Sequence, residues 1–177
     1  MSLSTARQPE WRDMLISREL AVEMNEQIGR EFAASMQYVS IAAFFSGRHL
    51  KLLSKLFFDQ AEEERQHALK FVQYLLDTRA DLRIPAIAAP KPTFASAEEA
   101  ASAAVKWERE VTRQITTLMD QAVKENDYMS QSFLQWFIDE QLEEVVKMER
   151  LLGVIQQSGE RNLLMVEAYL VHIEKAS

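Results

Sequence analysis

Residues that break helices are scarce and unevenly placed in this chain. Its 177 residues include only four glycines and four prolines, and three of the prolines lie in one stretch, DTRADLRIPAIAAPKPTFAS. Proline lacks the backbone N–H that a helix interior requires, so this stretch cannot be helical throughout. On both sides of it, long segments carry apolar residues at helical spacing. The sequence therefore predicts an all-α fold of long helices with one extended connection.

Capping residues and breakers mark the ends of the helices: Ser46-Gly47, Ser96 with Glu99, Asn126-Asp127 and Ser158-Gly159. We expect an N-terminal extension over residues 1–16 and one domain over residues 17–177, with helices at about 17–45, 49–77, 96–125, 127–157 and 162–175. Short connections make neighbouring helices antiparallel, and the long connection can cross the full length of a bundle. The predicted architecture is a four-helix bundle with one long crossover and a short fifth C-terminal helix.

The composition favours cations as ligands. The net charge is −7 and the isoelectric point is about 5.1, which argues against binding nucleic acid through a basic face. The absence of cysteine excludes disulfides and thiolate metal sites. No apolar run approaches the roughly 18 residues of a membrane span, and the first residues lack the apolar block of a signal peptide. We therefore expect a cytoplasmic protein with no membrane partner.

Each predicted long helix has an apolar stripe that a glutamate interrupts near its midpoint. The interrupting residues are Glu31, Glu64 with His67, Glu108, and Glu144 with Gln141 one turn before it. The stripes must face the core because they are otherwise apolar. In an antiparallel bundle of equal helices the midpoints share one level. The sequence therefore predicts that these polar side chains converge in one buried layer.

Four carboxylates cannot stay ionised together in a core without compensation, since burying even one unpaired charge costs several kcal/mol. No Lys or Arg lies on the four stripes, so we expect metal ions and not an internal salt-bridge network. Carboxylates and one imidazole suit iron or manganese, and zinc less specifically. Taken singly, a glutamate is usually a solvated surface charge and a histidine a satisfied core residue. The coincidence of four stripes at one height favours the metal site.

A second acidic cluster adjoins this layer. Glu63, Glu140 and Glu143 each lie one position from a member of the central layer. Spacing alone supports two interpretations equally, an adjoining cation site at the edge of the bundle or a solvated acidic face. Tyr38 and Trp136 lie within a turn of the layer on their helices, where packing alone would also account for them.

Four segments resemble the ferritins, and most closely the bacterial non-haem ferritins of actinobacteria: NEQIGREFAASMQY, QAEEERQHA, WEREVT and QWFIDEQLEE. The resemblance runs from about Glu23 to Ala168. It implies a ferroxidase centre in which one iron is held by Glu31, Glu64 and His67, and the other by Glu64, Glu108 and Glu144 with Gln141 nearby. It matches Tyr38 and Trp136 to the aromatic residues that flank this centre. It also matches Glu63, Glu140 and Glu143, with Glu144, to a third iron site.

The resemblance further implies iron storage, with dioxygen or peroxide oxidising Fe(II) and Fe(III) mineral held inside a shell of twenty-four identical subunits. The fifth helix, which carries Tyr169 and His172, would line the fourfold axis. Bacterioferritin and rubrerythrin have a second Glu-x-x-His on the last core helix. Here Lys147 stands three residues after Glu144, so that motif is absent and no haem is expected.

One departure from the ferritin pattern and two rival functions remain open at this stage. Where animal ferritins carry acidic channel residues, this chain has Gln131 and Leu134, and Asp127 is a candidate channel residue instead. The first rival function is a di-iron redox enzyme that acts on peroxide or an organic substrate and stores nothing. The second is a non-catalytic helical assembly protein whose acidic layer is protonated or holds a structural ion.

Overall fold

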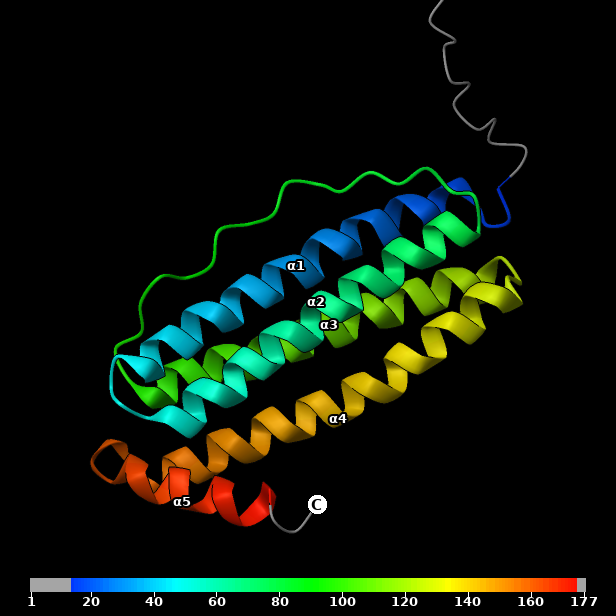
Figure 1. Ribbon diagram of the computed structural model, residues 1–177. Helices are drawn as coiled ribbons and strands as arrows, with labels where there is room; N and C mark the ends of the chain where they lie inside the picture. Colours follow the sequence, from blue (N-terminus) through cyan, green and yellow to red (C-terminus); the bar gives the residue numbers. More distant parts are fainter. Residues whose placement is uncertain (1–13, 175–177) are drawn as a thin grey trace, which may run out of the picture.

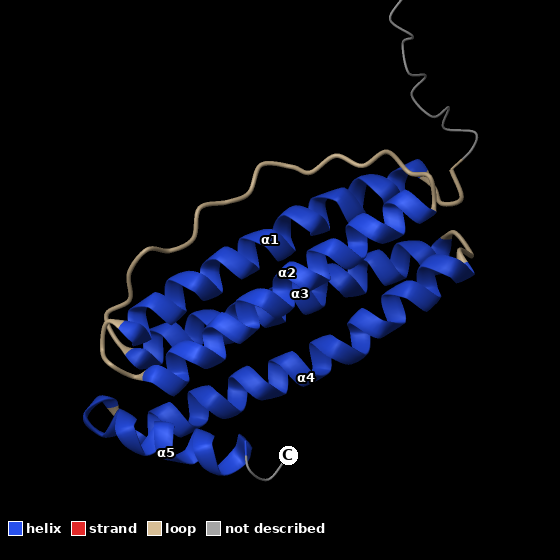
Figure 2. Ribbon diagram, viewed as in Figure 1, coloured by secondary structure: helices blue, strands red, loops and turns tan. Residues whose placement is uncertain are grey.

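The computed structural model describes residues 14–174, which form five α-helices and a short 3₁₀ helix (Figure 1). The helices are α1 (Arg18–Ser46), α2 (Lys51–Asp77), α3 (Ala97–Lys124), α4 (Tyr128–Ser158) and α5 (Leu163–Glu174), and the 3₁₀ helix spans Glu160–Asn162. Residues 14–174 contain no strand (Figure 2). The prediction of an all-α bundle with a short fifth helix is confirmed.

The helix ends agree with the predicted ones to within two residues, although the predicted end at residue 175 lies outside the described residues. Two N-caps form as expected, with side-chain oxygens of Ser96 and Asp127 accepting from the Glu99 and Ser130 backbone N–H groups. A third cap, which was not predicted, forms at Ser17, whose side chain accepts from the Leu20 N–H. The turn after α1 differs from the prediction. Gly47 has helical dihedrals (φ −62°), and His49 is the residue in the left-handed region (φ 61°). Helix α2 therefore begins at Lys51, two residues later than predicted.

The last residues of the predicted extension pack against the bundle. The Leu15 N–H donates to the Thr78 carbonyl at 2.9 Å, and Ile16 is buried in the core. These contacts fix the start of α1 beside the end of α2. Residues 1–13 of the predicted extension lie outside the described residues.

The long connection, residues 78–96, runs along the bundle from the end of α2 to the start of α3 (Figure 1). Side chains of α1 hold it by hydrogen bonds. Asn25 accepts from the Arg83 N–H at 2.6 Å, and Gln37 accepts from the Lys91 N–H at 2.8 Å. A Cβ at Gly29 would lie 2.4 Å from Pro85 Cγ, so the connection approaches α1 at a point where only glycine leaves room.

The buried apolar side chains form two clusters separated by the polar layer. On α1 the apolar residues Leu20 to Ile28 belong to one cluster and Ala34 to Phe45 to the other. On α3 the division falls between Val105 and Val111. Glu31 and Glu108 lie in these gaps, and both are fully buried. The core is therefore continuous hydrophobic packing at both ends and polar in the middle.

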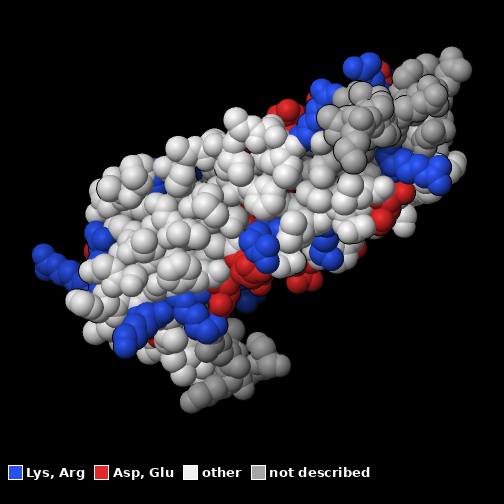
Figure 3. All heavy atoms as spheres, turned by 45° about the horizontal axis from the view of Figure 1, so that its top comes forward, with Lys and Arg blue, Asp and Glu red and all other residues white. Residues whose placement is uncertain are grey.

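On the face shown in Figure 3, acidic and basic side chains are interspersed and wide areas carry neither. Among the described helices, none combines the length and the apolar character that crossing a membrane requires.

Candidate metal centre

The structure buries every residue of the predicted central layer. Glu31 (α1), Glu64 and His67 (α2), Glu108 (α3) and Gln141 with Glu144 (α4) are each at most 4% exposed. The helical spacing explains the arrangement, because each residue takes one position in its helix's core-facing stripe. Helices α1 and α2 contribute three of these side chains, and α3 and α4 contribute the other three.

One half of the layer is already assembled as a ligand set. One donor atom from each of Glu31, Glu64 and His67 lies within 4.8 Å of the other two, and no other group of three or more such side chains within the described residues does so. The Nδ1 atom of His67 is 3.4 Å from Oε2 of Glu64. Both atoms, and Oε2 of Glu31, have no hydrogen-bond partner. Buried polar atoms are normally paired, so these atoms fit a bound cation.

The carboxylates of the other half of the layer are buried but do not form a compact ligand set. Glu108 accepts a hydrogen bond from the Tyr38 hydroxyl through Oε1, and its Oε2 has no partner. Glu144 accepts from the Gln60 side-chain amide at 2.7 Å. Neither glutamate joins the compact set of three. A second cation beside Glu64 would be the natural partner for both.

Glutamines orient the carboxylates, a role that the sequence analysis did not assign. Gln27 donates to Glu31 at 2.8 Å, and both are buried. The Gln60 amide donates to Glu64 at 3.1 Å as well as to Glu144, so it links Glu64 on α2 to Glu144 on α4. Each glutamine precedes a layer glutamate on its own helix by four residues, which is the spacing that brings side chains together. This four-residue spacing is visible in the sequence and could have predicted the contacts of the two glutamines with the layer.

A lysine also reaches the layer, although no Lys or Arg lies on the four stripes. Lys147 lies off the apolar stripe of α4, but its long side chain turns toward α2. Its Nζ donates to Gln60 Oε1 at 2.6 Å and to Glu63 Oε2 at 2.9 Å, and it lies 3.5 Å from Glu144 Oε1. Stripe positions alone do not reveal this contact, because the Lys147 side chain reaches the layer from a position beside the stripe.

The second acidic cluster lies at the rim. Glu63 and Glu143 are exposed and Glu140 is half-buried. With Glu144, they do not form a set of ligand atoms within 4.8 Å. The lysine ammonium occupies the side of this cluster next to Glu63 and Glu144.

Burial and mutual repulsion determine the protonation of the layer. Burial, and then the nearby Glu64, holds the pKa of Glu31 well above its ordinary value. Burial and Glu64 do the same to the pKa of Glu108. Burial raises the pKa of Glu144 to about 7, although Lys147 opposes the shift. Burial lowers the pKa of His67, but the Glu64 carboxylate outweighs it and the net shift is upward. Cations entering the layer would replace protons.

Two aromatic residues flank the layer as the sequence analysis anticipated. Tyr38 is fully buried, and burial together with Glu108 raises the pKa of its hydroxyl, which therefore stays protonated and donates. The Trp136 ring meets the His67 ring edge to face, with centroids 5.5 Å apart. Tyr38 thus orients a candidate ligand, while Trp136 restricts the His67 imidazole.

The candidate channel and axis residues lie elsewhere. The Asp127 carboxylate accepts from the Ser130 N–H and hydroxyl, so it caps α4, and Leu134 is fully buried. Tyr169 and His172 are exposed on α5. Helix α5 is attached to the bundle through Glu167, which accepts from the Leu52 and Leu53 N–H groups at 2.7 and 3.0 Å.

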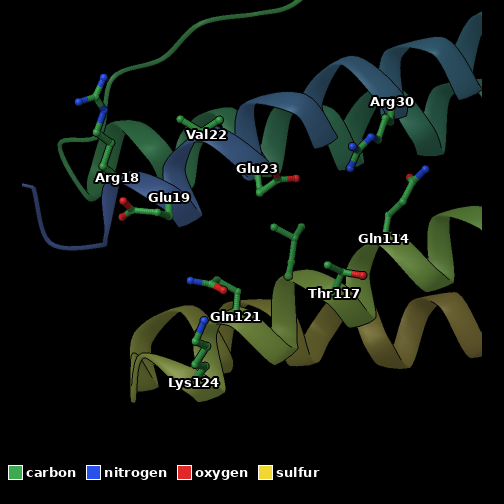
Figure 4. A pocket seen from close by; sticks show the side chains of 10 residues that line it. Arg18, Glu19, Val22, Glu23, Arg30, Gln114, Thr117, Gln121 and Lys124 are labelled. Atoms are coloured by element: carbon green, nitrogen blue, oxygen red, sulfur yellow. The ribbon is translucent and has the colours of Figure 1, made fainter.

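A groove of about 780 Å³ lies between α1 and α3 (Figure 4). Its rim mixes charges, with Arg18, Glu23 and Lys124 among the side chains drawn there. None of the layer glutamates lines it.

A four-helix bundle with one long crossover, and with carboxylates and a histidine projecting inward from all four helices, defines the class of ferritin-like carboxylate proteins. The ferritin-like domain profile matches residues 22–158. The ferritin BfrB of Mycolicibacterium smegmatis is 42% identical over 147 residues, which cover 83% of this chain and 81% of that protein. The bacterial non-heme ferritin of Staphylococcus saprophyticus is 34% identical over 146 residues, which cover 82% and 87%. This chain belongs to the ferritin family.

The fold comparison agrees with the sequence comparisons. The open pore ferritin of the archaeon Archaeoglobus fulgidus superposes with a TM-score of 0.84 at 29% identity. The superposition covers 88% of this chain and 96% of that one. Membership of the family supports iron storage.

Proposed function

We propose that this chain is an iron-storage ferritin that oxidises Fe(II) at a paired-iron ferroxidase centre and stores the product as Fe(III) mineral in a shell of twenty-four subunits. The observation that carries the proposal is the set of buried donor atoms without partners at one level of the core: Glu31 Oε2, Glu64 Oε2, His67 Nδ1 and Glu108 Oε2. Such atoms are costly unless something binds them. Family membership makes iron the ion of choice.

Fe(II) is the substrate in this scheme. One ion binds Glu31, Glu64 and His67, and the second binds Glu64, Glu108 and Glu144, with Gln141 beside it. Anionic carboxylates favour Fe(III) over Fe(II) and so lower the reduction potential of the pair. Each iron gives up one electron. Dioxygen takes up two electrons and two protons to give hydrogen peroxide, and peroxide in turn takes up two of each to give two waters.

The surrounding residues of the chain keep the ligands in position. Tyr38 donates to Glu108 and leaves the other oxygen of that carboxylate to the metal. Gln60 holds Glu64 and Glu144 at one amide, which sets the spacing of the bridge and the α4 ligand. Thr112 donates to Gln141 at 3.1 Å and fixes that side-chain amide beside the centre.

Three further parts of the proposal rest on the resemblance to bacterial non-haem ferritins. They are a third iron site at Glu63, Glu140 and Glu143 with Glu144, a cytoplasmic location, and assembly without haem. The exposed residues of α5, including Leu164, Met165 and Tyr169, are available for subunit contacts at an axis of the shell.

Iron retention tests the proposal directly. A large excess of Fe(II) is added in air to metal-free protein, and the iron that co-elutes with protein in size exclusion is counted per chain. Many irons per chain in a very large particle support a storage shell. A few irons per chain in a small oligomer would replace the proposal with a di-iron redox enzyme. A protein that retains no iron, with Glu64→Ala identical to wild type, would support a non-catalytic assembly protein.

A further inference from the structure

The proposed function gives no role to Lys147, a residue that contacts the centre. Its Nζ donates to Gln60 Oε1 at 2.6 Å and to Glu63 Oε2 at 2.9 Å. It also lies 3.5 Å from Glu144 Oε1. Its side chain is 39% exposed, so it lies where the buried layer meets the solvent. A cation therefore stands between the inner carboxylates and the acidic rim.

The position of Lys147 follows from helical spacing. Residues 140, 143 or 144, and 147 recur at intervals of three and four and share one face of α4. Glu63 lies across from them on α2, next to Glu64. The ammonium group thus already engages Glu63 and Glu144, two of the four carboxylates that a metal ion at the rim would use.

We propose that the Lys147 ammonium is the resident cation of the rim cluster, so that a metal ion binds Glu63, Glu140 and Glu143 with Glu144 only by displacing it. This inference rests on the proposed function, since it concerns the third site of that centre. A divalent ion and an ammonium group repel each other and compete for the same oxygens of Glu63 and Glu144. The chain therefore binds two ions tightly at the inner layer and a third one weakly.

Lys147 also acts on the inner layer through Gln60. The lysine holds the Gln60 carbonyl oxygen, which turns the Gln60 amide toward Glu64 and Glu144. When a third ion displaces the ammonium, this restraint is lost and Glu144 is free to turn outward. Lys147 is thus a positioning residue that couples the occupancy of the rim to the geometry of the inner site.

Titration of metal-free, assembled protein with Zn²⁺, which does not change oxidation state, tests the proposal by calorimetry. Wild type should bind two ions per chain tightly and a third weakly. Lys147→Met keeps the length of the side chain and removes the charge, and it should bind the third ion at least about tenfold more tightly, or about 1.4 kcal/mol. Lys147→Arg retains the charge and should behave as wild type. Lys147→Gln provides the same comparison should the Met variant fail to assemble.

A double variant identifies where the extra ion binds. In Lys147→Met with Glu143→Gln, binding of the third ion should weaken again, while the first two ions bind as they do in Lys147→Met alone. A third ion that binds wild type and both neutral variants equally would overturn the proposal, as would a gain that survives Glu143→Gln. Failure of the proposed function has a different signature. It appears as the absence of the two tight ions from wild type, whatever residue stands at position 147.

Discussion

The hydroxyl of Tyr38, on α1, donates a hydrogen bond to the Glu108 carboxylate, on α3, and so joins the two halves of the bundle at the level of the metal centre. Both residues are fully buried. The other oxygen of Glu108 has no partner, so the tyrosine is the main support of this carboxylate before metal binds.

Tyr38→Phe should destabilise the metal-free protein more than the metal-loaded one. Removing the donor leaves a buried carboxyl unpaired, at a cost of about 1–3 kcal/mol. A metal ion bound to Glu108 supplies a new partner and reduces the loss. Thermal unfolding with a chelator and with saturating Zn²⁺ gives the two values. Tyr74→Phe, which loses a hydroxyl contact to Ser130 away from the centre, is the control and should show no dependence on metal. An equal loss in both conditions for Tyr38→Phe would contradict this role.

Glu64→Ala should slow iron oxidation far more than Glu143→Ala. Glu64 is buried and is the proposed bridge between both ions, whereas Glu143 is exposed at the rim. We expect a decrease of at least about tenfold for Glu64→Ala, since even outer partners of metal ligands cost that much. The initial rate of Fe(III) formation, followed by absorbance after mixing with Fe(II) in air, measures the effect. Glu62→Ala, an exposed neighbour paired with Arg65, controls for changes to the helix. Similar rates for the Glu64 and Glu143 variants would show that the sites are assigned wrongly.

The stability of the metal-free protein should decrease as the pH rises from about 5 to 8. The pKa values of Glu31 and Glu108 are raised well above the ordinary value, and that of Glu144 is raised from 4.5 to about 7. The folded state therefore holds protons that the unfolded chain has already released, so the slope of stability against pH is negative. The raised pKa of His67 acts in the same direction. For Glu144 alone, the shift from 4.5 to about 7 corresponds to a loss of roughly 3 kcal/mol in the free energy of unfolding as the pH rises through this range.

Melting temperatures in chelator across this range measure the slope. Glu144→Gln removes one titrating group and should flatten it. Saturating Zn²⁺ should reverse it, because metal and protons compete for the same carboxylates. A stability that is level or rises with pH in the metal-free wild type is the result that would rule out protonated carboxyls in the layer.

Glu167→Ala should loosen α5 from the bundle. The α2 N-terminus has no side-chain cap of its own, and the Glu167 carboxylate accepts from two of its free N–H groups. Losing an N-terminal cap costs about 1 kcal/mol. Hydrogen exchange of the α5 amides should accelerate, and particle size should report any loss of assembly. Glu167→Gln keeps an acceptor oxygen and should retain most of the protection. Unchanged exchange in Glu167→Ala would mean that apolar packing alone holds α5.

The sequence predicted the layer because burial follows helical period. Glu31, Glu64, Glu108 and Glu144 occupy stripe positions, and a stripe position is buried whatever its neighbours are. The contacts of Lys147 with the layer could not be predicted, because its position is off the stripe and its reach depends on the rotamer of a long side chain. The capping role of Glu167 could not be predicted, because the N–H groups that it caps belong to another helix. The role of Gln60 required knowing that α4 lies against α2 at that height, which periodicity within one helix does not give.

The arrangement of the ligands also bears on how the chain closes. Helices α1 and α2 form one hairpin and α3 and α4 form another, and residues 78–96 connect them along the chain. Glu31, Glu64 and His67 all belong to the first hairpin, whereas the proposed second ion would use Glu108 and Glu144 from the second. A first ion could thus be bound by the first hairpin alone, while the second ion would be bound by residues of both hairpins and would hold them together. If the ions bind in this order, binding of the second ion would complete the association of the two hairpins. Without the second ion, the hairpins would remain able to separate.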